Sequence, residues 1–221
     1  MGRPREHDEA TGEALLDAAE ALLTAGGVDA VSVRAVADAA GTSTRAVYSR
    51  FGSKDGLTEA LAQRGYLLLA GLVDAVEPTA DPAADLVAAG IEGFRRFALE
   101  RPQLFQITFA RRPPGIGDGE ATRAALLASY DALVAWIRRA QEAGALADHP
   151  PNAIAFVFHA TCEGLANNEL ASQPPPAGAG MWPRRGHTHQ LDLWYLGLGA
   201  LVRGLAPEPP PSRARPRRGD V

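Results

Sequence analysis

Apolar residues recur at helical spacing along most of the chain, and short stretches rich in glycine or proline separate the periodic segments. Apolar side chains at positions i, i+3, i+4 and i+7 line one face of a helix. This pattern predicts an all-α fold. The predicted helices span about residues 8–25, 33–40, 44–51, 53–76, 82–100, 103–110, 119–143, 151–171 and 188–205.

The stretch from residue 32 to residue 57 contains closely spaced helix starts. Ser32, Ser43 and Ser53 each precede a helical pattern, and a serine there accepts a hydrogen bond from an unpaired backbone N–H of the first turn. Gly41 suits the left-handed conformation that often ends a helix. Two short helices joined by a turn that contains glycine make a helix-turn-helix, whose second helix enters the major groove of DNA.

The outward face of the second helix decides between two interpretations of this stretch. An ordinary helical corner of a globular domain would need no particular side chains there. With Val47 and Phe51 facing inward, Thr44, Arg45 and Tyr48 face outward. These three residue types contact base edges and phosphates. The pattern therefore favours a DNA-binding helix.

The same stretch resembles the TetR family of transcriptional regulators. The matching residues are Ser32-Val33-Arg34, Ala37, Ala40-Gly41, Ser43, Val47-Tyr48, Phe51, Ser53-Lys54 and Leu57. The resemblance is strong over the first quarter of the chain and weak over the rest. Thr42 departs from the family pattern, which usually has an aliphatic residue there, and this departure bears on the packing of the turn.

Two later segments are similar to the regulatory domain of one large subgroup of that family, the subgroup with a WHG-type C-terminal domain. They are FRRFALERPQLFQITF and FVFHATCEGLANNEL. In the second segment the glycine follows His159 by five residues instead of directly. The resemblance implies a three-helix DNA-binding head, joined by a long helix to a helical ligand-binding and dimerisation domain.

This organisation predicts a helix-turn-helix domain over residues 1–56, a regulatory and dimerisation domain over 57–205, and a disordered Pro/Arg tail over 206–221. The tail arginines could add sequence-independent attraction to DNA, or the tail takes no part. At the other end, Gly2-Arg3-Pro4-Arg5 is expected to be an extended arm that reaches the minor groove, or a disordered terminus.

The expected DNA contacts come from both short helices and from the start of the long helix. The predicted DNA-binding residues are Ser32, Arg34, Thr42, Ser43, Thr44, Arg45, Tyr48 and Lys54. Thr44 and Arg45 are the candidates for base edges, because arginine pairs well with guanine O6 and N7. Ser32, Arg34, Tyr48 and Lys54 are expected to hold phosphates. A symmetric dimer would bind a near-palindromic site in double-stranded DNA.

The net charge of −4 does not by itself indicate a nucleic-acid binder. Between residues 30 and 54, however, Arg34, Arg45, Arg50 and Lys54 stand against Asp38 alone. A local basic face on an acidic chain suits specific binding better than general attraction to DNA.

Aromatic residues gather in the later segments and are core residues by default. Some are also expected to line a pocket for a small-molecule effector, and the sequence does not separate the two uses. The candidate pocket residues are Phe94, Phe97, Phe105, Phe109, Trp136, His159, Cys162 and Glu163. Such a set favours an apolar or aromatic effector. His159 and Glu163 are interpreted as a buried or ligand-orienting pair, because no nucleophile motif or second carboxylate stands beside them.

No cofactor, metal site or membrane segment is expected. His187 and His189 lack the further ligands that zinc requires. Cys162 is the single cysteine, so no internal disulfide can form. There is neither a signal peptide nor an apolar run of ~20 residues, and a cytoplasmic protein is expected.

The helix expected at 188–205 is apolar on nearly every side. A helix of this kind needs burial on more than one side. We expect it to pair, together with the helix at 151–171, with the same helices of a second copy in a four-helix dimer interface.

The whole sequence predicts a transcriptional regulator, most simply a repressor, that a small molecule releases from its operator. The alternative is a small helical enzyme or carrier that retains a vestigial helix-turn-helix. That alternative needs a catalytic constellation, which the sequence does not provide.

Overall fold

The computed structural model describes residues 3–110, 119–172 and 190–207, and its regular structure within these ranges is helical, which confirms the predicted fold class. The elements are α1 (Arg3–Ala30), α2 (Val33–Ala39), α3 (Thr44–Phe51), α4 (Lys54–Asp74), α5 (Pro82–Ala88), η1 (Ala89–Arg95), α6 (Arg96–Glu100), α7 (Pro102–Phe105), η2 (Gln106–Ala110), α8 (Glu120–Glu142), α9 (Pro151–Ser172) and α10 (Gln190–Gly204). The predicted tail from residue 208 and the pair His187 and His189 lie outside the described residues.

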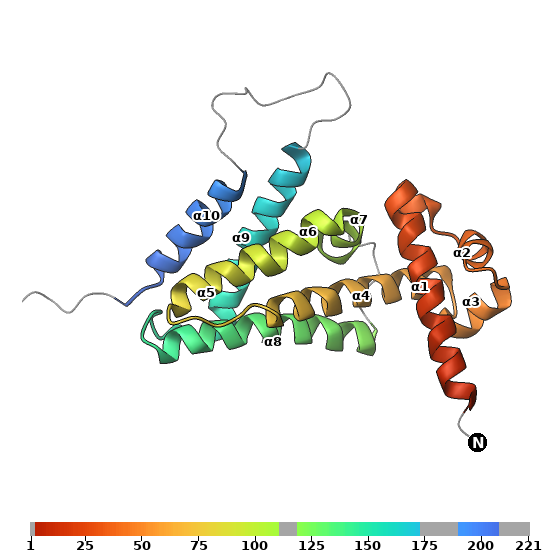
Figure 1. The fold of residues 1–221 in the computed structure, drawn as a ribbon, viewed down its shortest axis with the longest axis horizontal. Helices are drawn as coiled ribbons and strands as arrows, with labels where there is room; N and C mark the ends of the chain where they lie inside the picture. Colours follow the sequence, from red (N-terminus) through yellow and green to blue (C-terminus); the bar gives the residue numbers. More distant parts are fainter. Residues whose placement is uncertain (1–2, 111–118, 173–189, 208–221) are drawn as a thin grey trace, which may run out of the picture.

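The molecule is elongated, with a small helical head at one end of a larger helical body (Figure 1). Helices α1, α2 and α3 form the head. Helix α4 leaves the head and runs beside α8 along the body, while α9 and α10 stand toward the far end. The long helix α4 therefore carries the chain from the head into the body and packs against both parts.

The first helix begins earlier than predicted, and a short helical stretch follows its predicted glycine stop. It begins at Arg3, so residues 3–5 are a helical turn and the expectation of an extended arm is wrong. Pro4 fits there because the first N–H groups of a helix have no partner inside it. Gly27 takes φ 71° and ψ −168°, which breaks the helical geometry, but the chain returns to helix as far as Ala30. Gly27 therefore interrupts the helix at the predicted stop, and a short second helical stretch follows it within α1.

The core of the head takes apolar side chains from every packed helix. Leu15 and Leu23 of α1, Val36 of α2, Val47 of α3 and Leu57 of α4 are each at most 1% exposed. Full burial of such a side chain stabilises by roughly 1.5–3 kcal/mol. Together these contacts fix the position of α3 against the first turn of α4.

The turn between α2 and α3 is a Schellman motif, in which the two N–H groups after the helix bond back to its last turn. Gly41 has φ 63° and donates its N–H to Asp38 O at 3.2 Å. Thr42 donates its N–H to Ala37 O at 2.9 Å. The motif usually carries an apolar contact at the position of Thr42, which is half-buried here. Threonine therefore keeps the turn, with a smaller apolar contact than an aliphatic residue would make.

The body contains two π-helical segments that the apolar periodicity did not predict. The helix expected at 82–100 passes through η1, and the helix expected at 103–110 ends in η2. A π-helical turn holds one more residue than an α-helical turn, and such segments are frequent at functional sites. The elements were therefore predicted, and their internal geometry was not.

The far end of the body is held together by a buried polar network. Arg95 of η1 donates from Nε and Nη2 to the carboxylate of Glu169 in α9, at 2.9 and 2.6 Å. Trp194 of α10 donates from Nε1 to the same carboxylate at 2.8 Å. Glu169 and Trp194 are both buried, so this carboxylate fixes α10 against α9.

None of the helices within the described ranges combines the length and the hydropathy that a membrane span requires.

Candidate nucleic-acid interface and ligand cavity

Helix α3 presents a polar face to solvent at the end of the molecule away from α10 (Figure 1). Val47 is fully buried and holds the helix to the head from its inner side. Thr44, Arg45 and Tyr48 are exposed on the other side, and Tyr48 is 55% exposed. The three residues assigned to DNA thus lie on one open face of a rigidly packed helix.

Two cations near this face have no competing partner among the described residues. The side chains of Arg45 and Lys54 make neither an ion pair nor a hydrogen bond there. Arg34 approaches Asp38 at 3.9 Å, with both side chains mostly exposed. An ion pair so exposed contributes little. All three cations can therefore turn to a phosphate or base edge at small cost.

Arg50 takes a different position from the other cations of the head. Its guanidinium lies against Gly12 of α1, where a Cβ atom on the glycine would stand 2.6 Å from Arg50 Nε. Gly12 thus leaves room for the arginine between α3 and α1. Arg50 is exposed like the other cations, but its guanidinium lies against α1, whereas Thr44 and Arg45 lie in the N-terminal half of α3.

The serines of the head are helix caps, as predicted. The Oγ atoms of Ser32, Ser43 and Ser53 accept from the backbone N–H three residues later, at 3.1, 3.3 and 2.9 Å. Each hydroxyl keeps its own hydrogen to donate. The cap serines can therefore bond a phosphate without giving up the cap.

An ionic clamp joins the head to the body, and sequence reasoning missed it. Glu20 of α1, with a side chain 9% exposed, accepts from Arg64 Nη1 of α4 at 3.1 Å and from Arg101 Nη1 beside α7. Arg64 also reaches Glu13 and Asp17 at 2.8 and 2.7 Å. The partners of Glu20 lie 44 and 81 residues away in sequence, so local spacing carried no signal of the clamp.

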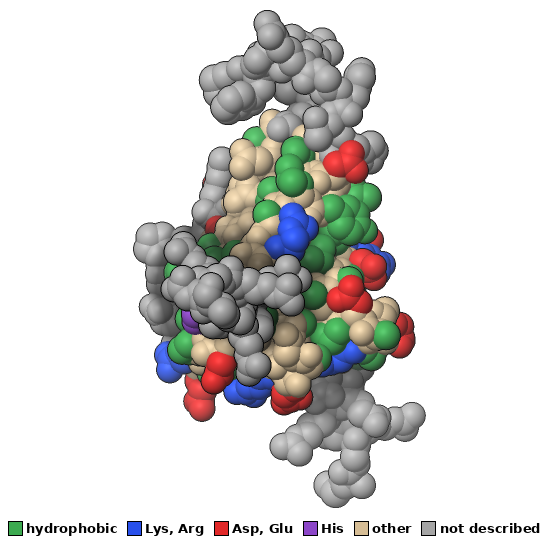
Figure 2. All heavy atoms as spheres, turned by 90° about the vertical axis from the view of Figure 1, so that its left-hand side faces the viewer, with side chains coloured by type: hydrophobic (Ala, Val, Ile, Leu, Met, Phe, Trp, Pro, Cys, Tyr) green, Lys and Arg blue, Asp and Glu red, His purple; other side chains and the backbone are tan. Residues whose placement is uncertain are grey.

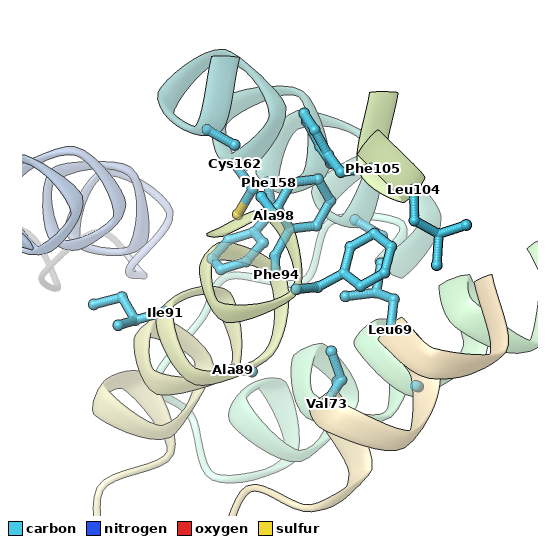
Figure 3. Packing of buried hydrophobic residues seen from close by; sticks show 14 of the residues in the cluster. Leu69, Val73, Ala89, Ile91, Phe94, Ala98, Leu104, Phe105, Phe158 and Cys162 are labelled. Carbon is cyan, nitrogen blue, oxygen red and sulfur yellow. The ribbon is translucent and has the colours of Figure 1, made fainter. Parts of the chain in front are cut away.

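A small cavity lies in the body between α4, η1, α8 and α9. Its volume is about 20 Å³, which is room for roughly one water molecule. Figure 3 shows Phe94 of η1 between Leu69 and Val73 of α4 on one side and Phe158 and Cys162 of α9 on the other. Side chains far apart in sequence therefore close around one apolar space.

His159 places a polar imidazole ring in the lining of this apolar space. Its ring centroid lies 5.2 Å from that of Phe94, 5.2 Å from that of Phe109 and 5.5 Å from that of Tyr130, which stacks on it. Among the described residues, His159 Nε2 is buried without a hydrogen-bond partner. Burial lowers the pKa of His159 to about 4, so the imidazole is neutral near pH 7.

The other titratable groups around His159 are also shifted by burial. Burial raises the pKa of Glu163, one helical turn further along α9. Burial, and then the charges of Glu163 and Tyr66, raise the pKa of Tyr130. Burial raises the pKa of the Cys162 thiol well above its usual range, and a buried protonated thiol is a poor nucleophile. These groups therefore suit the site to binding a molecule, and Cys162 does not suit it to nucleophilic attack.

Of the predicted pocket residues, Phe94, His159 and Cys162 line the cavity, whereas the lining does not include Phe97, Phe105, Phe109, Trp136 and Glu163. Phe94, Phe97, Phe105 and Phe109 form one cluster with ring centroids 5.4–6.5 Å apart, and Phe109 also contacts His159. Trp136 lies outside the cluster. Its Nε1 donates to the backbone oxygen of a residue in α4 at 3.2 Å, and Arg139 lies over its ring.

Tyr130, Leu69 and Val73 line the cavity although the sequence did not single them out. Apolar spacing along a helix does not distinguish cavity lining from ordinary core packing. For metals, the described ranges contain no group of three or more histidine, cysteine, aspartate or glutamate side chains that could hold an ion.

Family models match both parts of the chain. Residues 15–61 match a model described as "Bacterial regulatory proteins, tetR family", and residues 87–180 match one described as "Tetracyclin repressor-like, C-terminal domain". The first covers the head and the start of α4, and the second begins in α5 and continues past α9. Among curated proteins, none matches the chain in sequence.

Solved structures resemble this fold over most of its length. A protein with unknown function from Rhodococcus sp. RHA1 is 26% identical, with a TM-score of 0.72 over 89% of this chain and 95% of that chain. A putative tetR family transcription regulator from Shewanella sp. PV-4 is 18% identical, with a TM-score of 0.66 over 90% and 99%. The regulator FadR from Bacillus subtilis, solved with stearoyl-CoA, is 13% identical, with a TM-score of 0.66 over 87% and 98%. The last two likenesses concern the fold alone.

Proposed function

Because the chain belongs to the TetR family of bacterial regulatory proteins, it is a DNA-binding transcriptional regulator, and we propose that it is a repressor that a small molecule releases from DNA. The observation that carries the proposal is the open face of α3, where Thr44, Arg45 and Tyr48 are exposed on a helix fixed by Val47. The protein would act in the cytoplasm, where its promoter DNA is.

The N-terminal half of α3 would lie in the major groove. Thr44 and Arg45 would meet base edges there, with the Arg45 guanidinium on guanine O6 and N7. Tyr48, Lys54 and Arg34 would contact phosphates on either side and set the register of the helix in the groove. The cap serines, with Thr42 at the turn, lie beside these residues in sequence and would add hydrogen bonds to the backbone of the duplex.

Two heads are needed for a near-palindromic site, and α9 and α10 supply the surface for pairing. Phe156 and Val157 of α9 are 66% and 47% exposed, and Tyr195 and Leu196 of α10 are 55% and 63% exposed. Figure 2 looks onto this end of the body, where hydrophobic side chains lie among charged ones. Exposed apolar surface on both helices indicates an interaction site. A four-helix interface between two copies would cover it.

Release by a ligand follows from the way α4 connects both parts. Leu69 and Val73 of α4 line the cavity, and Leu57 of the same helix lies in the core of the head. A ligand that moves α4 would change the separation of the two heads. By linkage, a ligand that weakens DNA binding must bind the free protein better than the DNA-bound protein. The similarity to FadR, which was solved with stearoyl-CoA, supports a ligand-responsive function.

Selection of bound duplexes from a random DNA pool, at a stated salt concentration, tests this function. We expect enrichment of one near-palindromic sequence whose half-sites are separated by a whole number of helical turns, ~10 base pairs each. Recovery of a pool with no enriched sequence would refute sequence-specific regulation. Enrichment of a single half-site without symmetry would refute the dimeric mode.

A further inference from the structure

The polar chemistry of the body cavity points to one class of ligand. Most of the lining is apolar or aromatic, and it includes Leu69 and Val73 of α4, Phe94 of η1 and Phe158 of α9. The Ser129 hydroxyl in the lining already donates to the backbone oxygen of Leu126 at 2.7 Å. A molecule in this cavity therefore meets a largely apolar wall.

His159 Nε2 is the exception to that wall. It is the side-chain atom of the described residues that is both buried and without a hydrogen-bond partner. Buried polar atoms nearly always have a partner, because leaving one unpaired costs as much as a lost hydrogen bond. An unpaired nitrogen on a residue that lines a largely apolar cavity marks a place where a ligand atom can bond.

The state of His159 restricts what that ligand atom can be. A neutral imidazole has one nitrogen that donates and one that accepts. A hydroxyl group fits Nε2 in either tautomer, because it can donate to the bare nitrogen or accept from its N–H. A carboxylate would be buried beside a neutral imidazole and near Glu163, with no cation among the lining residues.

We propose that the cavity binds a small uncharged aromatic molecule with one hydroxyl group, a molecule of the phenol class, whose hydroxyl pairs with His159 Nε2. This inference rests on the proposed ligand-responsive function and gives its effector a chemical class. The aromatic ring lies beside Phe94 and Phe158 of the lining, where Phe94 already makes an edge contact with the His159 ring. Such contacts favour an aromatic guest over an aliphatic one.

The cavity must enlarge to admit a ring, and the surrounding elements are suited to that change. Tyr130 and Phe109 are half-buried, and both contact the His159 ring. Phe94 and Phe109 belong to the π-helical segments η1 and η2, where one residue per turn can be redistributed. Displacement at Leu69 and Val73 then passes into α4.

Binding of three single-ring probes to the DNA-free full-length protein tests the proposal. Phenol, toluene and benzylamine have similar volumes and differ in the group that would meet His159 Nε2. Calorimetry and the thermal unfolding midpoint should show phenol bound about tenfold or more tightly than toluene, with benzylamine weakest. Equal binding of phenol and toluene, a preference for benzylamine, or no binding of any probe would overturn the proposal.

Two variants of His159 and one control separate pairing from packing. His159→Leu should abolish the preference for phenol over toluene, while His159→Gln, which can donate or accept, should retain part of it. His149→Leu replaces an exposed histidine and should leave all three affinities unchanged. Retention of the full phenol preference by His159→Leu would exclude His159 as the partner. Circular dichroism of each variant shows that it is folded.

The outcomes of this test are separable from those of the DNA selection. Phenol binding is measured without DNA, and DNA selection is performed without ligand. Loss of phenol selectivity with an intact operator preference refutes the ligand class alone. Loss of operator preference with intact phenol binding refutes the regulatory function alone.

Discussion

At the scale of single residues, substitution of Arg45 and substitution of Lys54 should have different effects on DNA binding. Arg45→Ala should weaken binding to the selected operator by roughly 1–3 kcal/mol and relax the preference at one base pair in each half-site, because a base contact is lost. Lys54→Ala should weaken binding to all sequences alike and lower the salt dependence by about one counterion. Fluorescence anisotropy at several salt concentrations measures both. A uniform loss for Arg45→Ala would make it a phosphate contact.

Asp85 gives the stability of the body a defined pH dependence. Burial would raise the pKa of its carboxyl group, but hydrogen bonds from Thr79 at 2.9 and 2.6 Å and the ion pair with Arg139 outweigh burial and lower it. A folded-state pKa below the unfolded value of ~3.9 means that the stabilisation is complete above that value and is lost as pH falls below it.

Asp85→Asn should therefore lower the free energy of unfolding by about 1–2 kcal/mol at pH 7. The difference from the wild type should stay constant from pH 5 to 8 and should shrink progressively as the pH falls below the unfolded-state value of ~3.9. Urea unfolding at each pH measures it. Asp81→Asn is the control, because asparagine caps α5 as well as aspartate does. A difference that persists unchanged into acid would show that the charge of Asp85 contributes nothing.

The sequence identified residues whose contacts are close along the chain, and it missed residues whose partners are distant along the chain. Ser32, Ser43 and Ser53 were assigned as caps correctly, because a cap bonds only three residues ahead. The partners of Glu20 and the stack of Tyr130 on His159 depend on helices that meet only in the folded chain. No periodicity within one helix reports such a contact.

At the scale of elements, the clamp on Glu20 sets how firmly α1 is held to the body. Glu20→Gln leaves Arg64 and Arg101 facing an amide in place of a mostly buried carboxylate. Removing one partner of a buried ion pair costs roughly 3–5 kcal/mol, and the partial exposure of Arg101 places this variant at the lower end. Hydrogen exchange should become faster along α1 and α7.

Glu13→Gln is the matched control for the clamp. Glu13 pairs with the same Arg64, but its side chain is 66% exposed. An exposed ion pair contributes at most about 1 kcal/mol. Equal effects of the two substitutions on hydrogen exchange would contradict a role for the buried carboxylate in joining head and body.

The apolar pattern of the sequence did not predict the π-helical segments. The same apolar face can be built by α-helical or π-helical turns, so the sequence predicted helices and not their winding. In the structure, η1 packs closely on α4, and a Cβ on Gly93 would stand 2.7 Å from a methyl group of Val73. Such an approach depends on the partner helix and cannot be read from η1 alone.

At the scale of the whole molecule, the dimer proposed through α9 and α10 has a direct test. Leu196→Glu places a charge on the exposed apolar face and should convert the protein to a monomer at micromolar concentration. Leu127→Glu, on an α8 residue 57% exposed, should leave the dimer intact. Analytical ultracentrifugation distinguishes these states. A Leu196→Glu protein that remains dimeric with full operator affinity would place the interface elsewhere.

The central claim is that α3 reads base pairs, and competition binding measures this most directly. Wild-type protein is bound to a labelled selected operator at fixed salt and is challenged with unlabelled operator or bulk genomic DNA. The account predicts that the operator competes better than the bulk duplex by a factor of about 10³ or more. Equal competition by both DNAs would contradict it, because α3 would then carry no sequence information.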